Sequence, residues 1–145
     1  MIKTVLVVCI GNICRSPMAE GLLRQALPEG DVGSAGLGAL AGQAADPKAV
    51  DLMSQQGVDI SGHRAQQLSY AMIRRADLIL VMDGAQRQEI QRLHPATTGR
   101  VFRLGELGKF DVPDPYRQPR PAFENALQLI RRGVESWVPR IRALG

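Results

Sequence analysis

The sequence is poor in cysteine: only Cys9 and Cys14 occur among its 145 residues. Two thiols in one short segment are not the disulfide framework of a small secreted protein. A chain of this length also buries roughly two thirds of the surface that its unfolded state exposes, so it needs neither disulfides nor a metal for stability. The pair therefore indicates either chemistry or ordinary buried thiols.

Long apolar runs are also missing, since none approaches the roughly 20 residues that a membrane-spanning helix requires. The first residues, MIKTVLVVCIG, contain one lysine and too short an apolar stretch for a signal peptide. We therefore expect no membrane span and a cytoplasmic location.

A large excess of one charge is absent as well, because 18 basic residues stand against 14 acidic ones, a net charge of +4. This balance slightly favours anionic ligands, but it is too small and too dispersed to predict a nucleic-acid partner. No internal repeat or low-complexity segment is visible, so the chemistry is left to the loops.

Apolar segments alternate along the chain with segments of helical periodicity. The runs TVLVVCI (4–10) and ADLILVMD (76–83) are typical of strands buried on both faces of a parallel sheet. Shorter strands are expected within 30–42 and at 100–104. Helices are expected from Pro17 to the PEG at 28–30, at 47–56, at 69–75, at 85–93 and from Phe123 onward. Three prolines should exclude regular structure from the loop at 105–119.

This alternation predicts an α/β fold in a single domain over residues 1–145. Its core should be an open four-stranded parallel sheet with helices on both faces, a flavodoxin-like arrangement. Ligand sites in such folds lie at the carboxyl ends of the strands. Cys9 lies at the end of the first strand.

The loop after that first strand is a candidate anion site, because unpaired backbone N–H groups meet the positive end of a helix dipole there. Gly11 lets the backbone curl, Asn12 tolerates left-handed dihedrals, and Arg15 adds a planar fork that matches two phosphate oxygens. The positive end of the helix dipole and the Arg15 guanidinium should together lower the pKa of the Cys9 thiol from about 8.5 into a range of roughly 3.5 to 7.5. A thiolate in a phosphate cradle is a nucleophile for phosphorus.

An isolated cysteine is more often a small buried hydrophobe. The order Cys, five residues, Arg, Ser between a buried strand and a helix favours the nucleophile instead. The two histidines, His63 and His94, give no functional signal.

Phosphoryl transfer from an ester also needs an acid that protonates the leaving oxygen. The segment DVPDPY (111–116) offers Asp111 and Asp114. Asp114 is the better candidate, because the prolines on both sides hold its backbone.

These residues resemble the low-molecular-weight protein tyrosine phosphatase family, and the likeness spans nearly the whole chain. The signature loop of that family is matched by Cys9, Gly11, Asn12, Cys14, Arg15, Ser16 and Pro17, and its acid loop by DPY at 114–116, with Phe123 seven residues past the tyrosine.

The resemblance implies that Cys9 attacks the phosphorus of phosphotyrosine and that Asp114 protonates the phenolate. A water activated by Asp114 would then hydrolyse the phosphocysteine. Arg15 and the backbone N–H groups of residues 10 to 15 would hold the phosphate oxygens. Those loop residues include Ile10, Gly11, Asn12, Ile13 and Cys14. Neither a metal nor a cofactor is implied.

The family also suggests roles for residues around the nucleophile. Asn12 would brace the strained loop, and Ser16 would donate a hydrogen bond to the Cys9 thiolate. Leu40 and Tyr116 would line the slot for the phenol. Cys14 would either form a reversible disulfide with Cys9 under oxidation or serve only in packing.

The stretch SAGLGALAGQAADPKAV resembles the bacterial branch that acts with tyrosine autokinases in capsule or exopolysaccharide synthesis, with Leu40 where other members carry an aromatic residue. The implied partners are a phosphotyrosine protein, namely a bacterial tyrosine kinase, and inorganic phosphate or other oxyanions. Two alternatives remain open: a thiol-coupled arsenate reductase, which needs further cysteines that this chain lacks after Cys14, and a module that only binds phosphate or phosphotyrosine.

Overall fold

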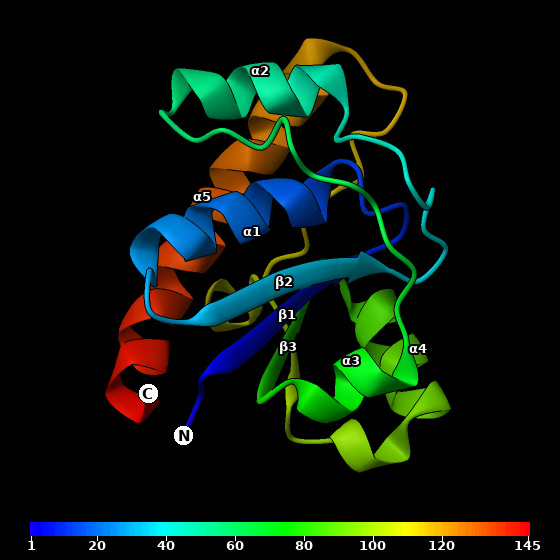
Figure 1. The fold of residues 1–145 in the computed structure, drawn as a ribbon, viewed down its shortest axis with the longest axis vertical. Coiled ribbons are helices and arrows are strands. Elements are labelled where there is room, and N and C mark those ends of the chain that lie inside the picture. Colours follow the sequence, from blue (N-terminus) through cyan, green and yellow to red (C-terminus); the bar gives the residue numbers. More distant parts are fainter.

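The computed structural model describes residues 1–145 and contains one four-stranded sheet (Figure 1). Every strand is parallel to its neighbours, and the spatial order is β2-β1-β3-β4. The strands are β1 (Thr4–Cys9), β2 (Asp31–Gly36), β3 (Leu78–Val81) and β4 (Val101–Arg103). The predicted fold class is therefore confirmed.

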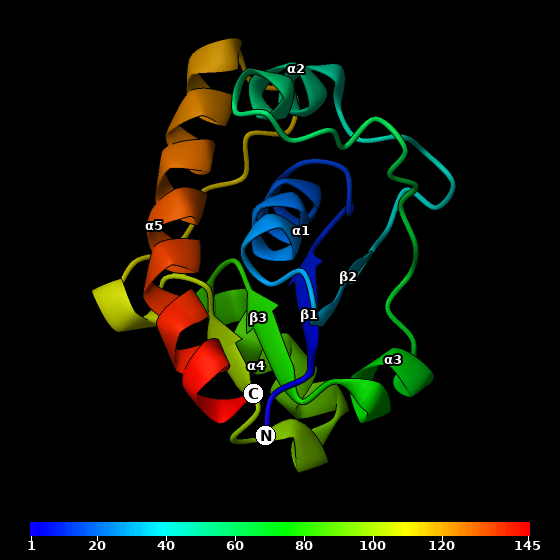
Figure 2. The same ribbon diagram turned by 60° about the vertical axis from the view of Figure 1, so that its left-hand side comes forward.

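Helices cover both faces of the sheet. Figure 2 shows α1, α2 and α5 on one side, with α3 and α4 on the other. Their bounds are α1 (Arg15–Ala26), α2 (Pro47–Gln55), α3 (Tyr70–Arg75), α4 (Gly84–Leu93) and α5 (Arg120–Leu144). None of these helices combines the length and the apolarity needed to cross a bilayer.

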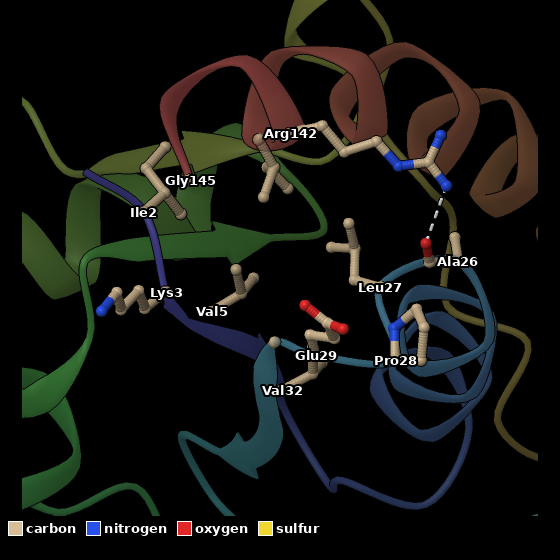
Figure 3. Close-up of a pocket in the computed structure, with 12 residues that line it drawn as sticks. Ile2, Lys3, Val5, Ala26, Leu27, Pro28, Glu29, Val32, Arg142 and Gly145 are labelled. Carbon is tan, nitrogen blue, oxygen red and sulfur yellow. Dashed lines mark hydrogen bonds between the residues drawn. The ribbon is translucent and has the colours of Figure 1, made fainter.

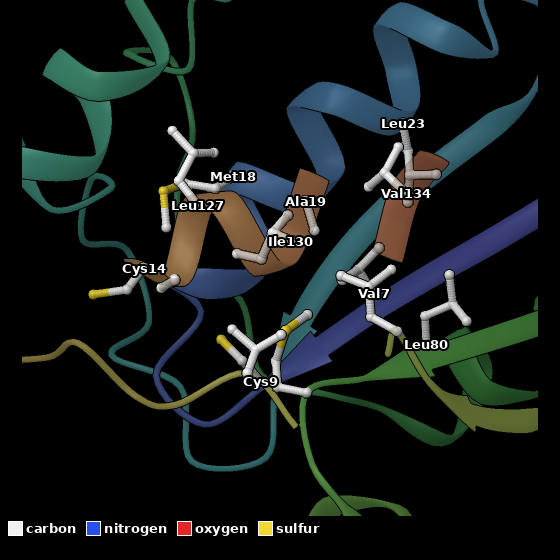
Figure 4. Packing of buried hydrophobic residues seen from close by; sticks show 14 of the residues in the cluster. Val7, Cys9, Cys14, Met18, Ala19, Leu23, Leu80, Leu127, Ile130 and Val134 are labelled. Atoms are coloured by element: carbon white, nitrogen blue, oxygen red, sulfur yellow. The ribbon is translucent and has the colours of Figure 1, made fainter. Parts of the chain in front are cut away.

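Alternation along β1 divides the core into two clusters. Val5, Val7 and Cys9 pack against the side of α1, α2 and α5, where the larger cluster lies. Figure 4 shows Val7 and Cys9 within it. Leu6 and Val8 face the smaller cluster, which α3 and α4 cover. Because both faces of the strand are buried, its sequence is a continuous apolar run, as expected for a central parallel strand.

The helix limits differ from the predictions by more than one residue at two places, the starts of α1 and α5. Helix α1 begins at Arg15, before Pro17, and Cys14 at its N-cap makes no side-chain capping bond. Helix α5 begins at Arg120, because proline is tolerated in a first helical turn and Pro121 does not delay the start. The predicted absence of regular structure in 105–119 is wrong at Glu106–Gly108, which forms one 3₁₀ turn.

Gly133 lets α5 approach the end of β4 closely. A Cβ at this position would lie 2.6 Å from Leu104 Cγ and 2.9 Å from the Leu104 carbonyl oxygen. We expect Gly133→Ala to lower the free energy of unfolding by about 1–3 kcal/mol through overpacking, against the gain that alanine normally brings in a helix. Urea unfolding of the parent and the variant measures this change in the free energy of unfolding.

Gly84→Ala is the matched control, because a Cβ there meets nothing within 4 Å. We expect this variant to be as stable as the parent or more stable by about 0.5 kcal/mol. A stabilising effect of Gly133→Ala would contradict the close approach of α5.

Candidate active site

Two cavities of different character lie at opposite ends of the sheet. The larger, about 600 Å³, lies at the amino ends of the strands beside the end of α5 (Figure 3). Its walls are mainly apolar, and it contains no cysteine, serine or histidine. The smaller, about 120 Å³, contains Cys9 and Arg15 at the carboxyl end of β1, where parallel sheets carry their ligand sites.

The small cavity brings together almost every residue that the sequence singled out. It is lined by Cys9, Ile10, Gly11, Ile13, Cys14, Arg15, Gly38, Leu40, Asp114 and Tyr116. Asn12 and Ser16 are the two predicted site residues that do not line it, and both are fully buried. We call residues 9–15 the anion loop.

The anion loop carries backbone N–H groups without protein partners. The N–H groups of Ile10, Gly11, Ile13 and Cys14 make no hydrogen bond within the chain. Unpaired N–H groups at the start of a helix form an anion site, so this set is available to an anion at the start of α1. The Asn12 N–H is an exception to the predicted cradle, because it donates to Cys9 Sγ at 3.3 Å.

The Cys9 sulfur has a second polar neighbour in Ser16, whose Oγ lies 2.9 Å away. Cys9 is only 3% exposed, and its side chain belongs to the buried cluster under α1 (Figure 4). The Asn12 N–H donates to this buried sulfur, and such a contact stabilises negative charge that develops on sulfur, since hydrogen bonds to a charged group are stronger than those to a neutral one. Ser16 thus lies within hydrogen-bond distance of Cys9, and its donation to a thiolate stays a prediction.

The second cysteine has a different environment. Burial, together with the negative charge of Asp46, raises the pKa of the Cys14 thiol to about 12, so this thiol is neutral at pH 7. Both cysteines are free in the structure. The redox role of Cys14 stays a prediction.

The difference between the two thiols can be measured by alkylation. We expect iodoacetate at pH 8 to modify Cys9 and to leave Cys14 unmodified, because the thiolate is the reactive form. Peptide mass spectrometry identifies the modified residue, and Cys9→Ser supplies the control. Alkylation of Cys14 at a comparable rate would contradict its neutral state.

The guanidinium of Arg15 is buried and held from three sides. Its Nη1 donates to the Val112 carbonyl at 2.9 Å and lies 3.7 Å from Asp83 Oδ2, and its Nη2 lies 3.7 Å from Asp114 Oδ2. The planar fork is therefore fixed at one end of the cavity. A fixed fork can bind two oxygens of a phosphate at little further entropic cost.

The structure distinguishes the two candidate acids. Asp114 lines the cavity, its carboxylate is about half exposed, and Oδ1 accepts the Tyr116 N–H at 3.1 Å. Asp111 instead pairs with Arg103 at 3.0 Å and does not line the cavity. Only Asp114 can reach a group bound above Cys9.

Asn12 holds the anion loop in a left-handed turn, with φ at 60°. Its Nδ2 donates to Ser16 Oγ at 2.7 Å and to Ser34 Oγ at 2.9 Å, and its Oδ1 accepts the Gln66 N–H at 2.9 Å. The Asn12 carbonyl contacts His63 Nε2 at 2.7 Å. The predicted bracing role therefore has a structural basis.

The glycine-rich segment after β2 runs directly beside the anion loop. Leu37, Gly38 and Leu40 donate their N–H groups to the carbonyls of residues 9, 10 and 11, at 2.9, 3.0 and 3.0 Å. A Cβ on Gly36 would collide with the Ile10 carbonyl oxygen. This contact explains the glycine and brings Leu40 to the cavity wall.

Sequence reasoning missed Asp83, His63, Ser34 and Gln66. Asp83 ends the predicted strand segment 76–83, and in the structure it caps α4 by accepting the Gln86 N–H at 2.8 Å. Its position after a central strand is the signal that could have linked it to Arg15. The others had no signal, because only the folded chain brings them to the anion loop.

Fold and site together define a small α/β phosphatase. The chain matches the family model described as low molecular weight phosphotyrosine protein phosphatase over residues 4–144, and it belongs to that family. It is therefore an enzyme of the protein-tyrosine-phosphatase class, a phosphoric monoester hydrolase.

The chain is similar to tyrosine phosphatases and, at lower identity, to an arginine phosphatase. The chain is 68% identical over the full length of both chains to the probable low molecular weight protein-tyrosine-phosphatase EpsP of Ralstonia nicotianae. The solved structure of the tyrosine phosphatase Wzb from Escherichia coli K30 with sulphate has a TM-score of 0.93 at 37% identity, covering all of both chains. The arginine phosphatase YwlE from Geobacillus stearothermophilus has a TM-score of 0.90 at 28% identity, covering 97% of this chain and 93% of that one.

Proposed function

We propose that this enzyme hydrolyses phosphotyrosine through a phosphocysteine intermediate. Cys9 is the nucleophile, Arg15 binds the phosphate, and Asp114 is the general acid and base. The observation that carries the proposal is the meeting of these three side chains in one small cavity, with Arg15 3.7 Å from Asp114 and Cys9 beside the free N–H groups.

In the first step the Cys9 thiolate forms a bond to phosphorus, and the bond from phosphorus to the phenolic oxygen breaks. Asp114 gives its proton to that oxygen, so the leaving group departs as neutral tyrosine. Arg15 and the N–H groups of Ile10, Gly11, Ile13 and Cys14 stabilise the charge on the other phosphate oxygens.

In the second step a water molecule attacks phosphorus, and Asp114, now a carboxylate, takes its proton. The bond between phosphorus and sulfur breaks, and Cys9 leaves as a thiolate. The Ser16 hydroxyl, 2.9 Å from Cys9 Sγ, stabilises that leaving thiolate. Neither step needs a metal or cofactor, since Cys9 supplies the electron pair and Arg15 the positive charge.

The cavity walls favour a flat aromatic substrate. Ile10 and Tyr116 are partly exposed at its rim, and Leu40 faces the anion loop from the neighbouring segment. These apolar side chains suit a phenol ring better than a short phosphoserine chain, which would leave them in water. A bacterial tyrosine kinase of exopolysaccharide synthesis is the partner that we propose, in the cytoplasm, where thiols stay reduced.

An assay on phosphotyrosine, phosphoserine, phosphoarginine and arsenate tests the substrate class. We expect hydrolysis of phosphotyrosine, inhibited by vanadate, and at least about tenfold lower kcat/KM on the other two phosphorylated substrates. A preference for phosphoarginine would replace this substrate, and thiol-dependent arsenate reduction would favour the reductase. Binding of phosphotyrosine without turnover would support a module that only binds.

A further inference from the structure

Arg117 follows Tyr116 at the rim of the small cavity and has no part in the proposed mechanism. Its backbone φ is 63°, and its exposed guanidinium lies 5.1 Å from the centre of the Tyr116 ring. We propose that Arg117 is a specificity-determining residue, which binds an acidic side chain next to the phosphotyrosine of a substrate protein. This inference rests on the proposed function.

The turn that carries Arg117 is of a kind that favours glycine. The Gln118 N–H donates to the Pro115 carbonyl at 2.9 Å, so residues 115–118 form a β-turn with Arg117 at its third position. Arg117 is the residue of this turn with a positive φ, which makes the turn type II. Glycine suits that position because a Cβ is strained there. Backbone stability therefore does not account for an arginine.

The contacts of the side chain do not account for it either. The Arg117 guanidinium makes no hydrogen bond and no ion pair within the chain, and it interacts with the Tyr116 ring through a cation–π contact. Such a contact at an exposed site contributes little to stability. It does fix the position of the charge, because the same tyrosine lines the cavity.

The carboxylates nearby already face other cations. Asp114, the acidic residue that lines the cavity, lies 3.7 Å from Arg15 Nη2. Asp51 of α2 pairs with Arg120 Nη1 at 2.6 Å. The positive charge of Arg117 is therefore left for a ligand at the rim.

The chemistry of a guanidinium selects the ligand. Its N–H donors form a planar fork that matches the two oxygens of a carboxylate. A phosphotyrosine whose phosphate reaches the anion loop brings the neighbouring residues of its own chain to the rim, where Ile10 and Tyr116 are partly exposed. An aspartate or glutamate next to the phosphotyrosine would pair with Arg117, whereas a lysine there would be repelled.

The experiment compares two phosphotyrosine peptides that carry either glutamate or glutamine on both sides of the phosphotyrosine. Arg117→Gly is the variant of choice, because glycine removes the side chain and suits the left-handed backbone. Arg140→Ala is the matched control. Arg140 is also exposed and unpaired, but it lies beside Leu78 at the amino end of β3, away from the cavity that contains Cys9.

We expect the parent enzyme to have about two- to fivefold higher kcat/KM on the glutamate peptide, the gain of one exposed ion pair. About 0.5 M salt should remove most of this preference, because exposed charges are screened. Arg117→Gly should act on both peptides about equally. Arg140→Ala should keep the preference of the parent, although it loses the same net charge.

Two results would overturn the inference. One is a parent enzyme that does not distinguish the peptides, or an Arg117→Gly enzyme that keeps the full preference. The other is an equal fall in kcat/KM on both peptides in Arg117→Gly, which would show that Arg117 only orients the Tyr116 ring. A thermal melt checks that each variant is folded. If the parent enzyme hydrolyses neither peptide, the proposed function fails instead.

Discussion

Cys9→Ser should lose phosphotyrosine hydrolysis by about 10⁴-fold or more, because nucleophiles of this kind cannot be replaced by a neutral hydroxyl. Cys9 Sγ accepts the Asn12 N–H at 3.3 Å and lies 2.9 Å from Ser16 Oγ. No base lies against Cys9 to ionise a serine in its place, since Asp114 is held near Arg15 at the cavity rim. Initial rates on phosphotyrosine measure the loss.

Cys14→Ser is the control for this prediction, because Cys14 is neutral and has no step in the proposed reaction. We expect it to keep most of the activity under reducing conditions. A Cys9→Ser enzyme that hydrolysed phosphotyrosine at the parent rate would remove Cys9 from the mechanism.

The Cys9→Ser variant should still bind inorganic phosphate. Arg15 and the free N–H groups of the anion loop remain in place without the thiol. Phosphate at 100 times its Kd should therefore raise the free energy of unfolding by about 2.7 kcal/mol in the parent enzyme and in Cys9→Ser alike. This result would separate binding from turnover, the distinction on which the alternative of a binding module depends.

The fold was predictable because its signals are local. The continuous apolar run of β1 reflects burial on both faces, and Asp46 before Pro47 marks the start of α2, where it caps Lys48 N–H at 2.9 Å. Proline and cap signals mark where a helix can begin, but packing decides which turn is used. This is why α1 begins at Arg15 rather than at Pro17.

The site was predictable in part for a different reason. Cys9, Asn12 and Arg15 lie in one loop, so their spacing alone indicates an anion cradle. Their supports come from distant segments: His63 is 51 residues from Asn12, and Val112 is 97 residues from Arg15. Neither spacing nor periodicity signals such contacts, because they arise only when parallel strands bring several loops to one edge of the sheet.

Asp114→Ala should lower kcat most on substrates whose leaving group needs a proton to depart. On phosphotyrosine we expect a loss of about 10²–10⁴-fold in kcat, the usual contribution of a general acid. On p-nitrophenyl phosphate the loss should be much smaller, since nitrophenolate leaves without a proton. Steady-state rates on a series of aryl phosphates measure this dependence.

Two variants define what this prediction excludes. Asp111→Ala is the matched control, because Asp111 sits in the same loop but pairs with Arg103 at 3.0 Å away from the cavity. It should leave the dependence on leaving group as in the parent enzyme. Asp114→Asn keeps the size of the side chain and loses its acid, so it should resemble Asp114→Ala.

Because Asp114 also lies 3.7 Å from Arg15, its loss could weaken phosphate binding instead, which would lower rates equally on all substrates. A uniform loss would therefore assign Asp114 to the electrostatics of Arg15, whereas a loss confined to poor leaving groups assigns it to proton transfer.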